Sequence, residues 1–229
     1  MAEKGNDIAV AIDGPMGSGK STIAREVARR LGYRHVDTGA MYRAVAAAAL
    51  RRGVSINDAE GLAALAARVR IEPGAAPDNG ALVFVDGEDL TAALRTVEVN
   101  RIVGQVARVS GVRAALRDTQ RTLGAAGRVV MEGRDIGSVI LPDAAVKVFL
   151  TASPEERARR RQAELAAAGE LVPLDEVRRI EAEDDRAATT RDVAPLVVAK
   201  NAEVIDSTDL PVDEVVARVV ALVERARGV

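Results

Sequence analysis

Residues 8–24 read Ile8-Ala9-Val10-Ala11-Ile12-Asp13-Gly14-Pro15-Met16-Gly17-Ser18-Gly19-Lys20-Ser21-Thr22-Ile23-Ala24. A short apolar run stops at Gly14, and an apolar pattern with helical spacing begins near Lys20. The turn between them fits G-x-x-x-x-G-K-[ST], in which backbone N–H groups of a glycine-rich loop converge on phosphate oxygens. The stretch therefore predicts a strand, a phosphate-binding loop and a helix that starts at that loop.

The residue types of this loop fit nucleotide binding. Lys20 is expected to reach the β- and γ-phosphates, and the Ser21 hydroxyl to bind Mg²⁺. A glycine-rich turn that binds nothing is the alternative, but the flanking patterns supply the strand and the helix that the motif requires. The predicted ATP-binding residues are Gly14, Pro15, Met16, Gly17, Ser18, Gly19, Lys20, Ser21 and Thr22.

Composition narrows the class of protein. The chain has 229 residues, of which 48% are apolar, and this suits one globular domain with insertions. Lys plus Arg (32) nearly balance Asp plus Glu (34), and aromatics make up 2%, so neither charge nor stacking indicates a nucleic-acid partner. Cysteine is absent, which excludes disulfides and a cysteine nucleophile. No apolar run reaches ~18 residues and no signal pattern opens the chain, so we expect a cytoplasmic protein without a membrane partner.

The remaining chain alternates between strand and helix patterns. Strands are predicted at 33–36, 127–132, 145–150 and 203–206, and helices at 40–52, 58–68, 96–109, 112–125, 153–161, 174–186 and after Pro211. Residues 185–191 read as a polar loop. We expect an α/β fold with a parallel sheet of about five strands and helices on both faces.

Two further features stand out in this pattern. Residues 68–72 and 81–86 alternate apolar and polar, with turn signals at Pro73-Gly74, Asp78-Asn79-Gly80 and Asp86-Gly87, which predicts a small antiparallel insertion. His35 is the only histidine. Without a second histidine or a cysteine, we interpret it as a half-buried strand residue and not as a metal ligand or general base.

Three further motifs carry a resemblance to a known family. They are Asp37-Thr-Gly-Ala-Met-Tyr-Arg43, Glu132-Gly-Arg-Asp-Ile-Gly137, and Arg191 ahead of Ala194-Pro195-Leu196. Together with the phosphate loop they resemble bacterial cytidylate kinase, a nucleoside-monophosphate kinase, from about Ile8 to the C-terminal helix. The resemblance implies a single P-loop kinase domain over 1–229, a mobile monophosphate-binding region at about 39–112 and a helical lid at about 153–191.

The resemblance also assigns roles to individual residues. Thr38, Arg113 and Asp135 take the positions that read the base, and Arg43, Arg134 and Arg191 those that hold the acceptor phosphate. A carboxylate at position 135 can accept from the cytosine amine, whereas it would face a carbonyl of uracil. Guanidinium groups suit a dianionic phosphate.

The reaction implied is in-line transfer of the γ-phosphoryl group of ATP to CMP or dCMP by a monomer. Lys20, Arg191 and the lid arginines Arg157 and Arg161 would stabilise the transferring group. Ser21 would bind Mg²⁺, with water-mediated contacts from Asp13 or Glu132. Two other classes stay open, namely a P-loop kinase for another small acceptor and a nucleotide-binding switch. No Asn-Lys-x-Asp motif is present, which counts against a GTPase.

One part of the family pattern is missing. Members commonly carry Arg-Asp-x-x-Asp-Ser-x-Arg before the Pro-Leu, whereas this chain has Asp184 in place of the first arginine and Ala188 in place of the second aspartate. Gly104 stands where a serine is often found. All three positions belong to the family's sugar contacts, so we expect weak discrimination between CMP and dCMP, unless Asp185 or Arg186 reaches the ribose.

Overall fold

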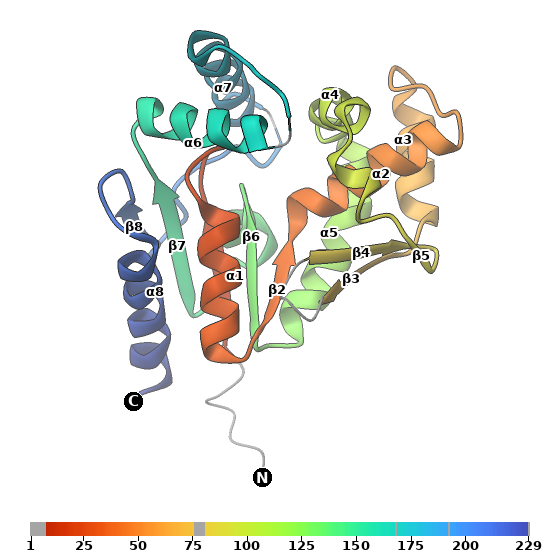
Figure 1. The fold of residues 1–229 in the computed structure, drawn as a ribbon. Coiled ribbons are helices and arrows are strands. Elements are labelled where there is room, and N and C mark those ends of the chain that lie inside the picture. Colours follow the sequence, from red (N-terminus) through yellow and green to blue (C-terminus); the bar gives the residue numbers. More distant parts are fainter. Residues whose placement is uncertain (1–7, 76–80, 168, 192, 229) are drawn as a thin grey trace.

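The computed structural model describes residues 8–75, 81–167, 169–191 and 193–228. Its centre is a sheet of five parallel strands in the order β2-β6-β1-β7-β8 (Figure 1). The strands are β1 (Ala9–Asp13), β2 (Arg34–Asp37), β6 (Val129–Gly133), β7 (Val146–Thr151) and β8 (Glu203–Asp206). The predicted parallel sheet is therefore confirmed.

Helices cover both faces of this sheet. Alternate side chains of β1 point to opposite faces: Val10 and Ile12 pack with α1 (Lys20–Leu31) and α8 (Val212–Arg227). Ala11 packs on the other face with Ile136 and Ile140 of the π-helical turn η2 (Ile136–Ile140), which follows β6. Every residue of this central strand except Ala9 is buried, as expected for a parallel sheet between two helical layers.

A second core lies beside the sheet (Figure 1). It is formed by α2 (Thr38–Arg51), α3 (Ala59–Arg68), the short 3₁₀ turn η1 (Ala93–Arg95), α4 (Val97–Val106), α5 (Ser110–Ala125) and a small antiparallel sheet. That sheet has the order β3 (Ile71–Ala75), β4 (Ala81–Val85) and β5 (Glu88–Asp89), and it pairs Ile71 with Val85. The predicted antiparallel insertion is therefore present.

The two long polar helices lie near the carboxyl ends of the parallel strands (Figure 1). They are α6 (Pro154–Ala167) and α7 (Leu174–Thr189), which pack against each other and are called here the α6–α7 hairpin. The Ser153 hydroxyl accepts from the backbone N–H of Glu156 at 3.3 Å, which is the bond that an N-cap residue makes. None of the helices in the described part of the chain combines the length and the apolar character of a membrane span.

Two local predictions are corrected. Pro73 and Gly74 lie inside β3 and do not form a turn, whereas Asp86 and Gly87 turn with positive φ as expected. The Asp78-Asn79-Gly80 turn lies outside the described residues. Helix α2 begins two residues early, because the Asp37 carboxylate caps it by accepting from the N–H of Ala40 at 3.0 Å.

The largest correction concerns the end of α7. Residues 185–189 continue the helix and are not a polar loop. Ala188 is buried, and its carbonyl accepts from the N–H of Leu196, so tertiary packing extends the helix by a turn. The Asp184 and Asp185 side chains are consequently held on a helix face.

Candidate functional site

The P-loop joins β1 to α1 and packs closely on β7. A Cβ at Gly14 would lie 2.0 Å from the carbonyl oxygen of Leu150, so only glycine fits at this position. Ser18 Oγ and Lys20 Nζ both donate to the carbonyl of Pro15, at 3.0 and 2.6 Å, which closes the loop into a compact ring. The predicted ATP-binding residues thus form the loop and the first turn of α1.

Lys20 lies in an environment that disfavours its charge. Burial lowers the pKa of Lys20 from 10.5 to about 8, and the nearby positive charge of Arg134 acts in the same direction. The carboxylates of Glu132, Asp13 and Asp37 act in the opposite direction. A cation held under these conditions gains most from an anionic ligand, which fits the phosphate role predicted for it.

Asp13 anchors the turn that follows β6. Its two carboxylate oxygens accept from the backbone N–H groups of Ile136 and Gly137, each at 2.7 Å. The side chain is 2% exposed, and burial raises its pKa from 3.8 to about 6 against these two hydrogen bonds. Asp13, predicted as a water-mediated Mg²⁺ contact, therefore fixes the turn that carries Arg134 and Asp135.

Glu132 links the P-loop to β2. One carboxylate oxygen accepts from the Ser21 hydroxyl at 2.8 Å, and the other lies 2.9 Å from Nε2 of the half-buried His35. The Thr38 hydroxyl donates to the Glu132 carbonyl at 2.7 Å, which ties the start of α2 to the end of β6. Two of the three side chains predicted to serve Mg²⁺, Ser21 and Glu132, are thus in direct contact.

The predicted base-reading residues Arg113 and Asp135 meet in a buried pair. Arg113 of α5 donates from Nη2 to Asp135 Oδ2 at 2.5 Å, and the two side chains are 5% and 9% exposed. Arg191 Nη2 lies 3.9 Å from the other Asp135 oxygen, and Arg113 lies over the ring of Tyr42 at 5.6 Å. Thr38, the third predicted base reader, bonds to the strand end that carries Asp135.

The predicted phosphate-binding arginines gather at the same edge of the sheet. Arg43 pairs with Asp37 at 3.3 Å, and Arg134 donates to Asp184 of α7 at 2.5 Å. The charge of Arg134 lowers the pKa of Lys20 and that of Arg191, so Arg134 is close to both. Burial is the largest cause of the lowered pKa of Arg191, followed by the charge of Arg113.

Arg113, Arg134 and Arg191 each have one nitrogen that donates no hydrogen bond to the described residues. Arg113 Nε, Arg134 Nη1 and Arg191 Nη2 are buried, and none has a hydrogen-bond partner among the described residues. A buried donor without an acceptor costs about 1–3 kcal/mol, so the arrangement is poor for stability by itself. It is well suited to a ligand that brings several acceptor oxygens.

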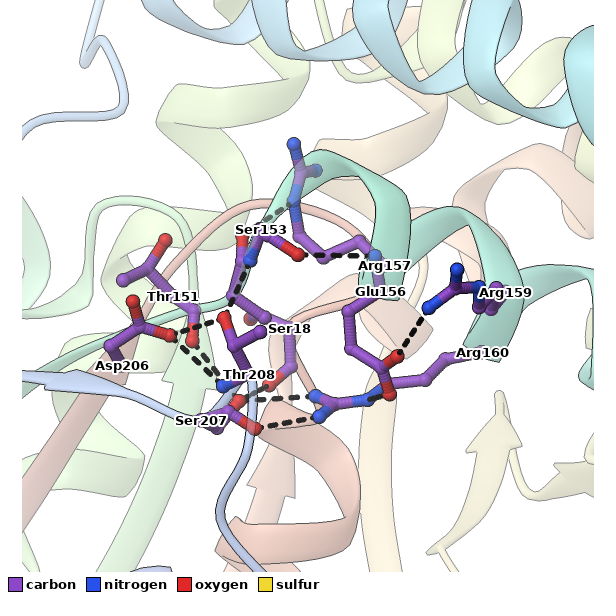
Figure 2. Close-up of polar contacts among 11 residues, drawn as sticks. Ser18, Thr151, Ser153, Glu156, Arg157, Arg159, Arg160, Asp206, Ser207 and Thr208 are labelled. Carbon is purple, nitrogen blue, oxygen red and sulfur yellow. Dashed lines mark hydrogen bonds and ion pairs between the residues drawn. The ribbon is translucent and has the colours of Figure 1, made fainter.

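The arginines of α6 differ in their surroundings, and Figure 2 shows Arg157, Arg159 and Arg160. Arg157 is buried and joins three elements, because it donates to the carbonyls of Ala152 and Met16 and to Asp185 at 2.7 Å. Arg161 pairs with Glu164 at the surface.

Arg160, which the sequence did not single out, reaches the side of the P-loop. It donates to the hydroxyl and the carbonyl of Ser207, at 3.0 and 2.7 Å, and the Ser207 hydroxyl lies 3.3 Å from the carbonyl of Ser18 (Figure 2). Only the rotation of α6 distinguishes Arg160 from its neighbours in the arginine run.

Glu181 of α7 is the second residue that sequence reasoning missed. It is 2% exposed, and neither carboxylate oxygen has a hydrogen-bond donor among the described residues. A Cβ at Gly17 would lie 2.8 Å from Oε1 of Glu181, so this carboxyl group lies directly against the P-loop. Burial raises the pKa of Glu181. Nothing in the local sequence distinguishes it from the other acidic residues of α7.

Comparison with known proteins agrees with this geometry. The cytidylate kinase family model matches residues 10–225. A cytidylate kinase from Pelotomaculum thermopropionicum is 50% identical over 95% of this chain and 96% of its own length, and one from Symbiobacterium thermophilum is 47% identical over 96% and 97%. The structure of an uncharacterized protein from Eubacterium ventriosum matches 96% of this chain and 99% of its own with a TM-score of 0.54. The two sequences are 11% identical, so this likeness concerns the fold alone. The chain therefore belongs to the cytidylate kinase family.

Proposed function

We propose that this chain transfers the γ-phosphoryl group of ATP to CMP or dCMP. Family membership supports the reaction, and one structural observation carries the assignment of the acceptor site. A buried carboxylate, Asp135, lies among Arg113, Arg134 and Arg191, each of which has an unused buried donor. This combination offers one acceptor for an exocyclic amine and several donors for ring acceptors and phosphate oxygens, as cytidine monophosphate requires.

Positioning and charge supply the catalysis in this proposal. The backbone N–H groups of the P-loop and Lys20 hold the donor phosphates, while Arg134 and Arg191 hold the acceptor phosphate close to Lys20. The loose transition state of phosphoryl transfer needs little covalent chemistry from the protein. Arg157 holds the P-loop and α7 together, and Arg157 and Arg161 of this helix are both assigned to the transferring group.

The residues near Ser21 suit a hard divalent cation. Mg²⁺ prefers oxygen ligands and is usually held by one or two carboxylates together with substrate phosphates, so no all-protein cage is needed. Ser21 would hold it, with Glu132 and Asp13 through water, and when bound the ion would neutralise charge on the phosphates.

The proposal extends to the parts of the molecule that would move. Residues 39–112 are assigned to monophosphate binding and residues 153–191 to a lid whose closure excludes water. We also propose that the chain acts as a monomer in the cytoplasm, without nucleic-acid or membrane partners.

A coupled assay of ADP release tests the acceptor. CMP, dCMP, UMP, dTMP, AMP and shikimate are offered in turn with ATP and Mg²⁺. We expect CMP and dCMP to be the best acceptors. Faster release with AMP or shikimate would instead identify a kinase for another acceptor, and slow release that no acceptor stimulates would favour a nucleotide-binding switch.

A further inference from the structure

Helix α7 presents a row of carboxylates to the phosphate-binding side of the molecule. Glu181, Asp184 and Asp185 have the spacing i, i+3 and i+4, so they share one face of the helix. Asp184 accepts from Arg134, Asp185 accepts from Arg157, and Glu181 lies against the P-loop. This acidic face therefore contacts groups that the proposed function assigns to nucleotide phosphates.

The contact of Asp184 is the most informative of the three. Arg134 Nη2 donates to Asp184 Oδ2 at 2.5 Å, while Arg134 Nη1 is buried and has no hydrogen-bond partner among the described residues. A guanidinium holds an oxyanion best through two parallel N–H groups. A phosphate that binds across Nη1 and Nη2 of Arg134 therefore shares Nη2 with Asp184 and places its negative charge beside that carboxylate.

Several buried carboxylate oxygens on this face of α7 have no hydrogen-bond donor among the described residues. Glu181 has two buried carboxylate oxygens without donors among the described residues, and Asp185 Oδ1 is likewise buried without one. Carboxylates buried without full hydrogen bonding favour states in which they are released to water. The contact between α7 and the core therefore has a built-in reason to open.

We propose that Asp184 competes with the acceptor's phosphate for Arg134, and that acceptor binding thereby breaks this ion pair and frees α7 for the lid closure of the proposed function. The inference rests on the proposed role of Arg134 in binding the acceptor phosphate. The phosphate carries a larger negative charge than the carboxylate and displaces it. The displaced Asp184 leaves Arg134, whereas the Asp185–Arg157 pair, to which no acceptor atom is assigned, still joins α7 to α6.

Equilibrium binding of CMP and of cytidine, which lacks the phosphate, tests this competition. Asp184→Asn keeps the size of the side chain and removes its charge. We expect the variant to bind CMP about three- to tenfold more tightly and cytidine unchanged, the range expected for loss of a half-buried ion pair. Glu183→Gln is the matched control, because Glu183 is the adjacent residue, is exposed and pairs with Arg179.

Two further arms keep the test decisive. In an Arg134→Ala background, Asp184→Asn should leave CMP affinity unchanged, and Asp184→Ser repeats the test with a different side chain. Unchanged or weaker CMP binding by Asp184→Asn, or equal tightening of CMP and cytidine, overturns the competition. A wild-type protein that binds neither compound contradicts the proposed function itself, and this result is visible before any variant is examined.

Discussion

The turn after β6 and the α6–α7 hairpin both border the P-loop, but they are held in different ways. The turn is fixed by two backbone N–H groups that donate to the buried Asp13. The hairpin is held by side-chain pairs, Asp184 with Arg134 and Asp185 with Arg157. Backbone hydrogen bonds to a buried group set a position, whereas ion pairs at the edge of solvent exchange partners when a stronger anion arrives. We therefore propose that the fixed turn recognises the acceptor and that the hairpin responds to ligands.

Lys20→Ala should have the largest effect, because Lys20 is the P-loop cation that we assign to the phosphates of the donor. We expect kcat to fall at least about 100-fold, since loss of a cation beside the transferring group costs several kcal/mol of barrier. The thermal unfolding temperature should stay close to that of the wild type. The exposed Lys200→Ala is the control. Retention of more than about a tenth of the turnover would show that the loop assignment is wrong.

Arg157→Ala should loosen the hairpin and leave the turn after β6 in place. Its loss leaves Asp185 unpaired and removes the contact with Met16, which we expect to cost about 3 kcal/mol of local stability. Amide hydrogen exchange should accelerate about 100-fold in α6 and α7, with β6 and the following turn unchanged. Arg161→Ala, which removes an exposed pair, should have little effect. Faster exchange throughout the sheet would show that the two regions are one cooperative unit.

The anchor of the turn should be visible in the pH dependence of stability. The pKa of Asp13 is about 6 in the folded chain, whereas its ordinary value is 3.8, so the folded chain keeps a proton that the unfolded chain loses between these values. The stability contributed by this group therefore decreases by up to about 3 kcal/mol as pH rises from about 4 to about 6. It is constant at higher pH.

Urea unfolding of wild type and Asp13→Asn at several pH values isolates this contribution, because the other carboxylates cancel in the difference. The unfolding free energy of the wild type relative to the variant should fall over this pH range. A difference that stays constant with pH contradicts the raised pKa.

Asp135→Ala tests whether the fixed turn reads the base. Truncation leaves Arg113 without its buried partner, so both CMP and UMP should react more slowly. The informative quantity is the ratio of kcat/KM for CMP to that for UMP. It should fall by an amount equivalent to about 1–3 kcal/mol, the value of one buried hydrogen bond to a charged group. The exposed Asp143→Ala should keep the wild-type ratio, and an unchanged ratio in Asp135→Ala would remove the base-reading role.

The smallest effect concerns the sugar. Gly104 is exposed with open space around it, Ala188 is buried, and Asp185 and Asp184 are paired with arginines. Each missing hydrogen bond to a ribose hydroxyl is worth about 0.5–1.5 kcal/mol, so CMP and dCMP should have kcat/KM values within about tenfold. Because Ala188 is buried, Ala188→Asp should favour CMP over dCMP only if its carboxylate reaches the 2′-hydroxyl. A wild-type preference for CMP above about a hundredfold would point to other ribose contacts.

Much of the fold follows from local pattern. The loop between the first strand and helix and the buried strands depend on near neighbours in the chain, and their prediction was confirmed. Errors arose where distant contacts decide. Pro73 and Gly74 are strand residues because β4 pairs with them, and α7 continues to Thr189 because Ala188 packs on the core.

The sequence was enough to predict which residues make up most of the candidate site. The glycine-rich loop and the polar residues at strand ends are recognisable from their order along the chain. Their pairing follows from tertiary packing. The rotation of α6 brings Arg157 and Arg160 toward the P-loop while Arg161 pairs at the surface, and α7 places Glu181 on Gly17 and Asp184 on Arg134. The physical reason is that charged side chains on a helix look alike in sequence, whereas their partners are set by the packing of elements far apart in the chain.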